Sequence, residues 1–282
     1  MVTASPPKEQ AVFVDGPEGA LAAVVTRPET PTGIGVVICP GGWYGTSTNR
    51  NRVVVRLARE IAALGHTVVR FDWHGVGDSS GEIDRFVLDR PFVGDVVAVC
   101  EALSGAADRL LMIGVCFGGR SALAAASQLE NLSGLVLVSF PFPAEQTKAD
   151  WRARKMGWRG VANVATNPEL WRPAARWATR RLRPVPAGPK ARDISLTPGS
   201  FRADMGELRD RGVTVDLVFG ADDLELVSFE ALRQGPLGDY LERSRPGIEV
   251  AVTERGDLSS FRSLEAQKTA IELITAIVRR RL

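Results

Sequence analysis

The stretch that decides the fold is Leu110-Leu-Met-Ile-Gly-Val-Cys-Phe-Gly-Gly-Arg-Ser-Ala-Leu-Ala-Ala-Ala126. Its first six residues are an apolar run typical of a buried strand, and its last six begin an Ala/Leu-rich helical pattern. Glycines at 114, 118 and 119 permit a sharp turn and leave room around a strained residue. The pattern predicts Cys116 on a tight strand-to-helix turn, where the helix N-terminus favours a thiolate. The alternative is a Gly-rich turn around a buried structural cysteine.

Strand and helix patterns alternate along most of the rest of the chain. Residues 11–15 and 20–26 flank a Gly-Pro-Glu-Gly turn and indicate a starting hairpin. Apolar runs predict strands at residues 34–39, 67–72, 134–140, 213–219 and 248–253, and helical spacing predicts helices at 52–64, 86–103 and 263–281. This alternation predicts a doubly wound sheet of about eight strands, mostly parallel after the hairpin.

Composition limits the class of protein. The chain of 282 residues has a net charge of +2, is 45% hydrophobic and 24% charged, and contains three cysteines. These values predict a globular protein with ample material for a core. An odd and small number of cysteines argues against a disulfide framework, and the first ten residues resemble no signal peptide. We therefore expect a cytoplasmic protein with no membrane span and no nucleic-acid partner; the oligomeric state stays open.

The alternation is interrupted between about residues 142 and 201. We expect a helical insertion there, between core segments 1–141 and 202–282. Lysines and arginines outnumber acidic residues 12 to 4 between residues 141 and 193, and four tryptophans fall in the same stretch, Trp151, Trp158, Trp171 and Trp177. We expect these tryptophans to contact substrate. The basic face indicates a solvated helix surface or a docking face for an anionic group, such as a carrier protein or a CoA arm.

The motif Gly-Val-Cys-Phe-Gly-Gly resembles the cysteine nucleophile elbows of dienelactone hydrolases and polyhydroxyalkanoate synthases, within the α/β-hydrolase superfamily. The resemblance implies an α/β-hydrolase fold with Cys116 as nucleophile and with residues 142–201 as a helical cap. It also implies an oxyanion hole built from the N–H of Phe117 and from Trp43 or Gly42, in the loop after residues 34–39. A family acid is expected in the Gly-Ala-Asp-Asp turn, at Asp223 with Asp222 as second candidate.

The family's catalytic histidine is missing from the sequence. Leu258 stands at its expected place, beside Asp257, and the chain has only two histidines elsewhere. We expect His66 to lie on the surface in a turn, and His74 to follow the strand at 67–72. His74 and Asp257 are the remaining candidates for moving a proton. Without an evident base, hydrolysis of an acyl-cysteine is harder than its formation, which favours transfer to a better acceptor.

Three functions follow from these observations. The first is cysteine-dependent acyl transfer or thioester/ester cleavage on a carrier-linked, CoA-linked or polyketide-like acyl substrate. The second is a lyase or cyclase on the same scaffold, for which activity would survive Cys116→Ala. The third is a non-catalytic binding protein. No metal or organic cofactor is implied, because the chain has neither a ligand cluster nor a dinucleotide fingerprint.

Overall fold

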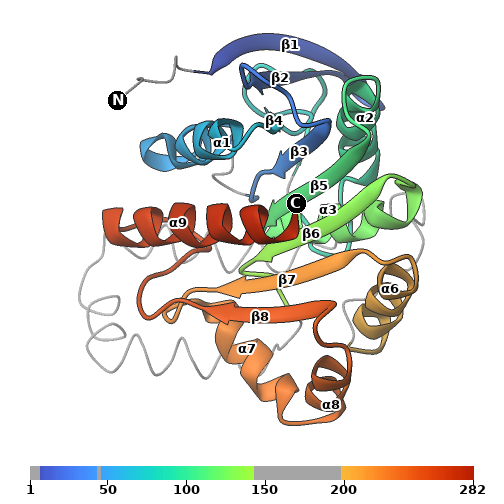
Figure 1. The fold of residues 1–282 in the computed structure, drawn as a ribbon, viewed down its shortest axis with the longest axis vertical. Helices are drawn as coiled ribbons and strands as arrows, with labels where there is room; N and C mark the ends of the chain where they lie inside the picture. Colours follow the sequence, from blue (N-terminus) through green and yellow to red (C-terminus); the bar gives the residue numbers. More distant parts are fainter. Residues whose placement is uncertain (1–6, 43–45, 85, 143–197) are drawn as a thin grey trace. The chain divides into compact units, whose positions relative to one another are not determined.

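The fold is built on one eight-stranded sheet (Figure 1). The computed structural model describes residues 7–42, 46–84, 86–142 and 198–282. The strands run in the order β1-β2-β4-β3-β5-β6-β7-β8. Their bounds are β1 Lys8–Gly16, β2 Gly19–Arg27, β3 Ile34–Cys39, β4 Thr67–Phe71, β5 Arg109–Val115, β6 Leu132–Val138, β7 Thr214–Phe219 and β8 Ile248–Val252. The predicted α/β architecture with about eight strands is confirmed.

The strands divide into a hairpin and a parallel sheet. β1 and β2 pair antiparallel, and β2 pairs antiparallel with β4, whereas all pairs from β4 to β8 are parallel. β5 lies at the centre between β3 and β6, and is buried along almost its whole length because helices cover both faces. The carboxyl end of β5 therefore lies beside the carboxyl ends of β3 and β6, where the loops that follow these strands begin.

Side chains alternate along each strand between two hydrophobic cores. In β3, Val37 and Cys39 face one core while Val36 and Ile38 face the other. Helices α2 Val93–Ser104, α3 Phe117–Ala125, α6 Pro198–Asp210, α7 Leu224–Arg233 and α8 Pro236–Arg243 cover the first face. Helices α1 Val53–Ala63 and α9 Leu264–Arg281 pack together on the second face, which is turned toward the viewer in Figure 1. Short 3₁₀ turns occupy Arg50–Arg52 and Ala126–Gln128.

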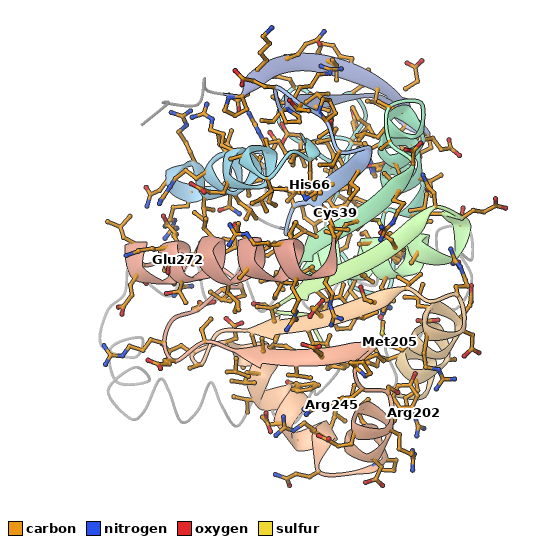
Figure 2. All side chains as sticks on the ribbon, viewed as in Figure 1. Cys39, His66, Arg202, Met205, Arg245 and Glu272 are labelled. Carbon is orange, nitrogen blue, oxygen red and sulfur yellow. The ribbon has the colours of Figure 1, made fainter. Side chains whose placement is uncertain are left out.

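Two local predictions were wrong. The helix expected from residue 86 begins only at Val93, because Pro91 disfavours helical backbone at the residue before it. His66, expected on the surface, is 5% exposed (labelled in Figure 2) and its Nδ1 lies 2.8 Å from Oγ1 of Thr32. The turn before β4 is therefore held down by a side-chain hydrogen bond rather than left in solvent.

The chain divides into two compact units, Met1–Phe142 with Ile194–Leu282, and Pro143–Asp193. The second unit, with the four predicted cap tryptophans, lies outside the described residues. In the first unit, α6 packs the ring of Phe201 against Phe140 and Phe142, at centroid distances of 5.5 and 5.0 Å. No helix in the described part of the chain is both long and apolar enough to cross a membrane.

Candidate active site

Cys116 occupies the turn between β5 and α3. Its backbone adopts φ 48° and ψ −109°, a strained conformation for a residue with a side chain. Two hydrogen bonds fix this conformation: the N–H of Cys116 donates to the carbonyl of Val138 at 2.8 Å, and its carbonyl accepts from Arg120 N at 3.2 Å. The thiol is partly exposed and forms no disulfide. The predicted strand-turn-helix geometry around Cys116 is what the structure has.

The glycines around the turn are required by close backbone approach. A Cβ on Gly118 would collide with the carbonyl oxygens of Cys39 and Pro40, at the end of β3. A Cβ on Gly114 would lie 2.5 Å from the Cα of Gly119. The start of α3 therefore sits directly on the ends of β3 and β5, which brings Cys116 to the loop that follows β3.

Cys116 lines a cavity of about 690 Å³. The lining residues come from the β3 loop, the segment before α2, the Cys116 turn, the start of α7 and the β8–α9 loop. They are Gly41, Gly42, Asn49, Arg50, Phe86, Leu88, Cys116, Phe117, Pro141, Glu225, Ser259, Ser260 and Arg262. Its mixture of apolar and charged side chains around one thiol is typical of a small-molecule site.

Two of the predicted oxyanion donors lie at this cavity. Phe117 is the first residue of α3, so its N–H has no acceptor within the helix. Gly42 lies against it, because a Cβ on Gly42 would come within 3.3 Å of the Cβ of Phe117. Trp43 lies outside the described residues. The backbone of the β3 loop at Gly42 and that of the turn at Phe117 can thus approach one substrate oxygen beside Cys116.

Asp223 is buried at the start of α7, with 1% of its surface exposed. Its Oδ1 accepts from the N–H groups of Leu258 (2.7 Å) and Ser259 (3.2 Å). Its Oδ2 accepts from Oγ of Ser139 (2.5 Å) and from N of Gly220 (2.7 Å). Asp222 is exposed and instead holds the 256 turn, accepting from Gly256 N at 3.1 Å. The carboxyl group of Asp223 therefore holds the β8–α9 loop in place through these hydrogen bonds.

Asp257 forms a carboxyl pair with Asp223. Burial raises the pKa of Asp223 to about 7, with a contribution from the neighbouring charge of Asp257, although its hydrogen bonds oppose this shift. Burial also acts to raise the pKa of Asp257, but hydrogen bonds from Ser259, Ser260 and Asp223 outweigh it and hold that pKa below its usual value. Asp257 is therefore ionised at neutral pH, while Asp223, with a pKa near that pH, is partly protonated.

Ser259 and Ser260 follow Asp257 and hydrogen-bond to its carboxylate. Ser259 donates from Oγ to Oδ1 and Ser260 donates from Oγ to Oδ2, both at 2.6 Å. The backbone N–H groups of both serines also donate to Oδ1, at 3.0 and 3.2 Å. Both serines line the Cys116 cavity, whereas Asp257 itself does not.

Leu258 occupies the expected histidine position only with its backbone. Its N–H bonds to Asp223, but its side chain is fully buried in the core beneath α1 and α9, where Phe261 and Ala266 are also packed. The residues of this loop that reach the cavity are therefore Ser259, Ser260 and Arg262, which follow it. Sequence patterns do not predict this arrangement, because a leucine between polar residues does not show which way the loop turns.

His74 is held away from this group of residues. Its Nδ1 lies 2.8 Å from Oδ2 of Asp95, a carboxylate that also accepts from the His74 backbone N–H at 3.0 Å. That hydrogen bond raises the pKa of His74 above its usual value, and burial opposes the rise. The ring packs on Phe92 at 4.2 Å, and His74 is not among the cavity residues. The structure thus brings Cys116, Phe117 and Gly42 together, with Asp223 and Asp257 behind the serines.

Three charged residues of the cavity were not predicted from the sequence. Glu225 is nine-tenths buried in the first turn of α7, while Arg50 and Arg262 are exposed on opposite loops. Within the described part of the chain, neither arginine forms an ion pair. Single charges in loops have no periodic signal, so only the fold shows that they share a cavity.

No group of three or more metal-binding side chains occurs among residues 7–42, 46–84, 86–142 and 198–282.

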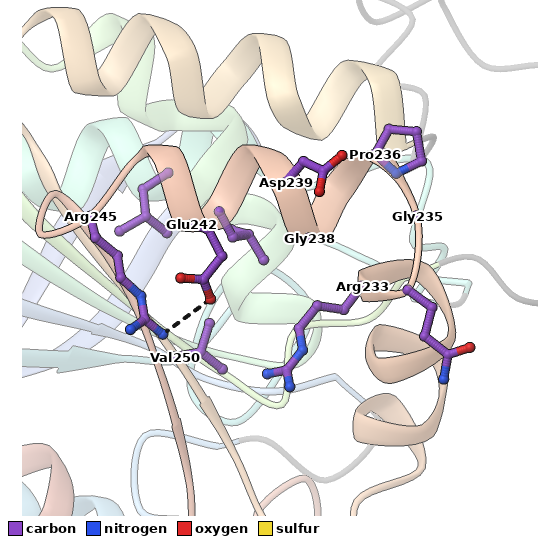
Figure 3. Close-up of a pocket in the computed structure, with 11 residues that line it drawn as sticks. Arg233, Gly235, Pro236, Gly238, Asp239, Glu242, Arg245 and Val250 are labelled. Atoms are coloured by element: carbon purple, nitrogen blue, oxygen red, sulfur yellow. Dashed lines mark ion pairs between the residues drawn. The ribbon is translucent and has the colours of Figure 1, made fainter.

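A second cavity, of about 430 Å³, lies between α8 and β8 (Figure 3). Its apolar wall consists of Leu241, Ile248 and Val250. Its arginines are already paired: Arg245 lies 3.5 Å from Glu242, and Arg233 lies 3.4 Å from Glu230. This second cavity contains no nucleophile, and its cations are neutralised. The Cys116 cavity is therefore the better candidate for the active site.

Comparisons with known proteins agree with this architecture. The curated Uncharacterized protein RP471 of Rickettsia prowazekii is 27% identical over 133 residues, 46% of this chain and 55% of that protein, so the match spans about half of the relative. An α/β serine hydrolase, XC6422 from Xanthomonas campestris, is 22% identical with a TM-score of 0.59, covering 99% of this chain and 97% of that one. An esterase from Pyrococcus furiosus, Pf2001, is 16% identical with a TM-score of 0.65, covering 97% and 93%.

The family model for the alpha/beta hydrolase fold matches residues 35–223. This range begins in β3, includes the Cys116 turn and ends at Asp223. Because the match covers well over half of the chain and the sheet order and central turn agree with it, the protein belongs to the α/β-hydrolase family.

Proposed function

We propose that this protein is a cysteine-dependent acyl-transfer enzyme that takes an acyl group from a thioester or activated ester. The observation that carries the proposal is the placement of Cys116 on a strained turn, at the N-terminus of α3 and in the wall of a cavity shared with Gly42 and Phe117. A helix N-terminus stabilises a thiolate, and a thiolate is the reactive form of cysteine.

The reaction follows from this placement. The Cys116 thiolate attacks the carbonyl carbon of the donor, and the N–H of Phe117 stabilises the resulting oxyanion, together with the β3 loop around Gly42. The donor's thiol or alcohol then leaves, so that the acyl group is carried as a thioester on Sγ of Cys116. Transfer to water or to another hydroxyl or amine releases the enzyme.

The charges of the cavity support an anionic donor. Arg50 and Arg262 line it from two separate loops, and the described residues provide neither of them with an ion-pair partner. Such a pair of guanidinium groups suits phosphate or carboxylate oxygens. The donor we propose is therefore an acyl group linked to CoA or to the phosphopantetheine arm of a carrier protein.

The test is intact-protein mass spectrometry after incubation with a panel of acyl thioesters. A mass increase equal to the acyl group is expected, and it should map to Cys116 by peptide analysis. Cys39 and Cys100 are internal controls, because burial raises the pKa of both thiols, that of Cys100 to about 12. Cys116→Ala should abolish the adduct. Absence of an adduct in the wild-type protein with every donor would refute the proposal.

A further inference from the structure

The β8–α9 loop places two hydroxyl groups where they share a cavity with Cys116. Ser259 and Ser260 line the cavity, and each donates its hydroxyl proton to Asp257 at 2.6 Å. A hydroxyl that donates its proton to a carboxylate presents its oxygen lone pairs to any other donor nearby. The loop thus offers the cavity two hydroxyl oxygens, each hydrogen-bonded to the partly buried carboxylate of Asp257.

From this geometry we infer that Ser260 and Asp257 form a proton relay that does the work of the missing histidine in releasing the acyl group. This inference rests on the proposed function, because the relay acts on an acyl group held by Cys116. Asp257 does not line the cavity itself, so a hydroxyl must connect it to the substrate.

The chemical step balances without another reactant. The oxygen of water or of an alcohol acceptor bonds to the carbonyl carbon of the acyl-cysteine while its proton passes to Oγ of Ser260. The Ser260 proton passes at the same time to Oδ2 of Asp257. The tetrahedral intermediate then expels the Cys116 thiolate, which regains that proton through Ser260. The products are the free acid or ester and the original thiol and carboxylate.

The hydrogen bonds favour Ser260 over Ser259 for this role. Oδ1 of Asp257 already accepts three hydrogen bonds, two from backbone N–H groups and one from Oγ of Ser259. The backbone N–H groups of the loop donate to Oδ1 and not to Oδ2, which accepts from Oγ of Ser260 at 2.6 Å. An oxygen with fewer donors accepts a proton more readily, so Oδ2 is the better terminus.

Asp257 is the ionised member of the carboxyl pair behind the serines. The lowered pKa of Asp257 keeps it ionised at neutral pH, whereas burial raises the pKa of Asp223 to about 7. Four hydrogen bonds fix Asp223, and two of its donors, Leu258 N and Ser259 N, belong to the same loop. Asp223 therefore acts as a positioning residue for the relay and does not itself touch the substrate.

The experiment separates formation of the acyl-enzyme from its breakdown. The full chain is acylated with a short acyl-CoA, freed of excess donor, and followed by intact mass as the adduct decays in water and in the presence of a small alcohol. Ser260→Ala, Ser260→Thr and Asp257→Asn are compared with the wild type. Ser133→Ala, which removes a hydroxyl bonded to a carbonyl outside the cavity, is the matched control.

The expected result is a decay about 100-fold slower in Asp257→Asn and at least about 10-fold slower in Ser260→Ala, since general-base catalysis contributes rate factors of this size. Acylation should change less than about 3-fold, Ser260→Thr should restore most of the decay rate, and Ser133→Ala should behave as wild type. Equal adduct lifetimes in wild type, Ser260→Ala and Asp257→Asn would overturn the relay and leave Cys116 acylation intact. A wild-type protein that never forms an adduct would instead refute the proposed function.

Discussion

The backbone N–H of Leu258 donates a 2.7 Å hydrogen bond to Oδ1 of Asp223, while the side chain of Leu258 is fully buried in the core. The acid therefore holds the main chain of the loop rather than an imidazole. Its other acceptor positions are filled by Ser259 N, Ser139 Oγ and Gly220 N. As a result, the side chains that this loop offers to the cavity are the hydroxyls of Ser259 and Ser260 and the guanidinium of Arg262.

The burial of Asp223 predicts that the protein is less stable at higher pH. Its pKa in the folded chain is raised from 3.8 to about 7, so the folded state binds the proton more tightly than the unfolded state does. Stability should then fall as pH rises from about 4 to about 7, by roughly 4 kcal/mol at full ionisation. Asp257, whose pKa is lowered, acts in the opposite sense and only below about pH 4.

Urea unfolding between pH 5 and pH 8 measures this effect, with Asp223→Asn as the comparison. The variant should be less stable overall, because an amide cannot accept from all four donors. Its stability should nevertheless change much less between pH 5 and pH 8 than that of the wild type. The two histidines contribute equally to both proteins, so they cancel in the difference. If the free energy of unfolding changed with pH to the same extent in both proteins, the pH dependence would not come from Asp223.

The two histidines should titrate on opposite sides of the ordinary value. The hydrogen bond to Asp95 raises the pKa of His74 above 6.5, whereas burial lowers that of His66 below 6.5. A tag-free sample contains only these two imidazoles, so proton–nitrogen correlation spectra as a function of pH resolve both. His66→Gln assigns the signals. If the signal that remains in this variant titrates below 6.5, the His74–Asp95 interaction is not formed in solution.

Periodic apolar patterns made the strands, most of the helices and the Cys116 turn predictable from the sequence. The start of α2 was misplaced because the apolar residues from Phe86 to Phe92 have helical spacing, yet they form an irregular segment with Phe86 and Leu88 in the cavity wall. Glu225, Arg262 and the two serines were missed because their placement depends on loop direction. Loop direction is set by hydrogen bonds between distant residues, such as those of Asp223, which leave no local pattern.

Gly118 should tolerate no side chain. A Cβ there would collide with the carbonyl oxygens of Cys39 and Pro40, and backbone atoms cannot move as a flexible side chain can. Gly118→Ala should therefore lower the free energy of unfolding by roughly 3 kcal/mol or more and displace Cys116. Gly105→Ala is the matched control, because no atom lies within 4 Å of its added Cβ and its φ is −71°. The control should gain up to about 1 kcal/mol.

Thermal unfolding and reaction of Cys116 with a small alkylating reagent check the Gly118 prediction together. Gly118→Ala should show both a lower midpoint and a changed alkylation rate, while Gly105→Ala should keep the wild-type alkylation rate. A variant Gly118→Ala with wild-type stability would mean that the start of α3 does not sit against the end of β3 as described.

Arg50 and Arg262 should determine the preference for anionic donors. Each is exposed, so its contribution is expected to be about 1 kcal/mol, equivalent to a several-fold change in KM. Arg50→Gln combined with Arg262→Gln should therefore raise KM for an acyl-CoA by about 10-fold or more, with little change in kcat. The same acyl group on N-acetylcysteamine lacks the phosphates, so its KM should hardly change.

Initial rates with both donors, in low and in raised salt, measure this preference. Arg255→Gln is the matched control, since Arg255 lies in the same β8–α9 loop, is 78% exposed and does not line the cavity. It removes the same charge and should leave both KM values unchanged. Raised salt should increase the KM of the wild type for acyl-CoA toward that of the double variant, because exposed charges are screened. If KM rose equally for both donors in the double variant, the arginines would be acting on the fold of the loops and not on the anion.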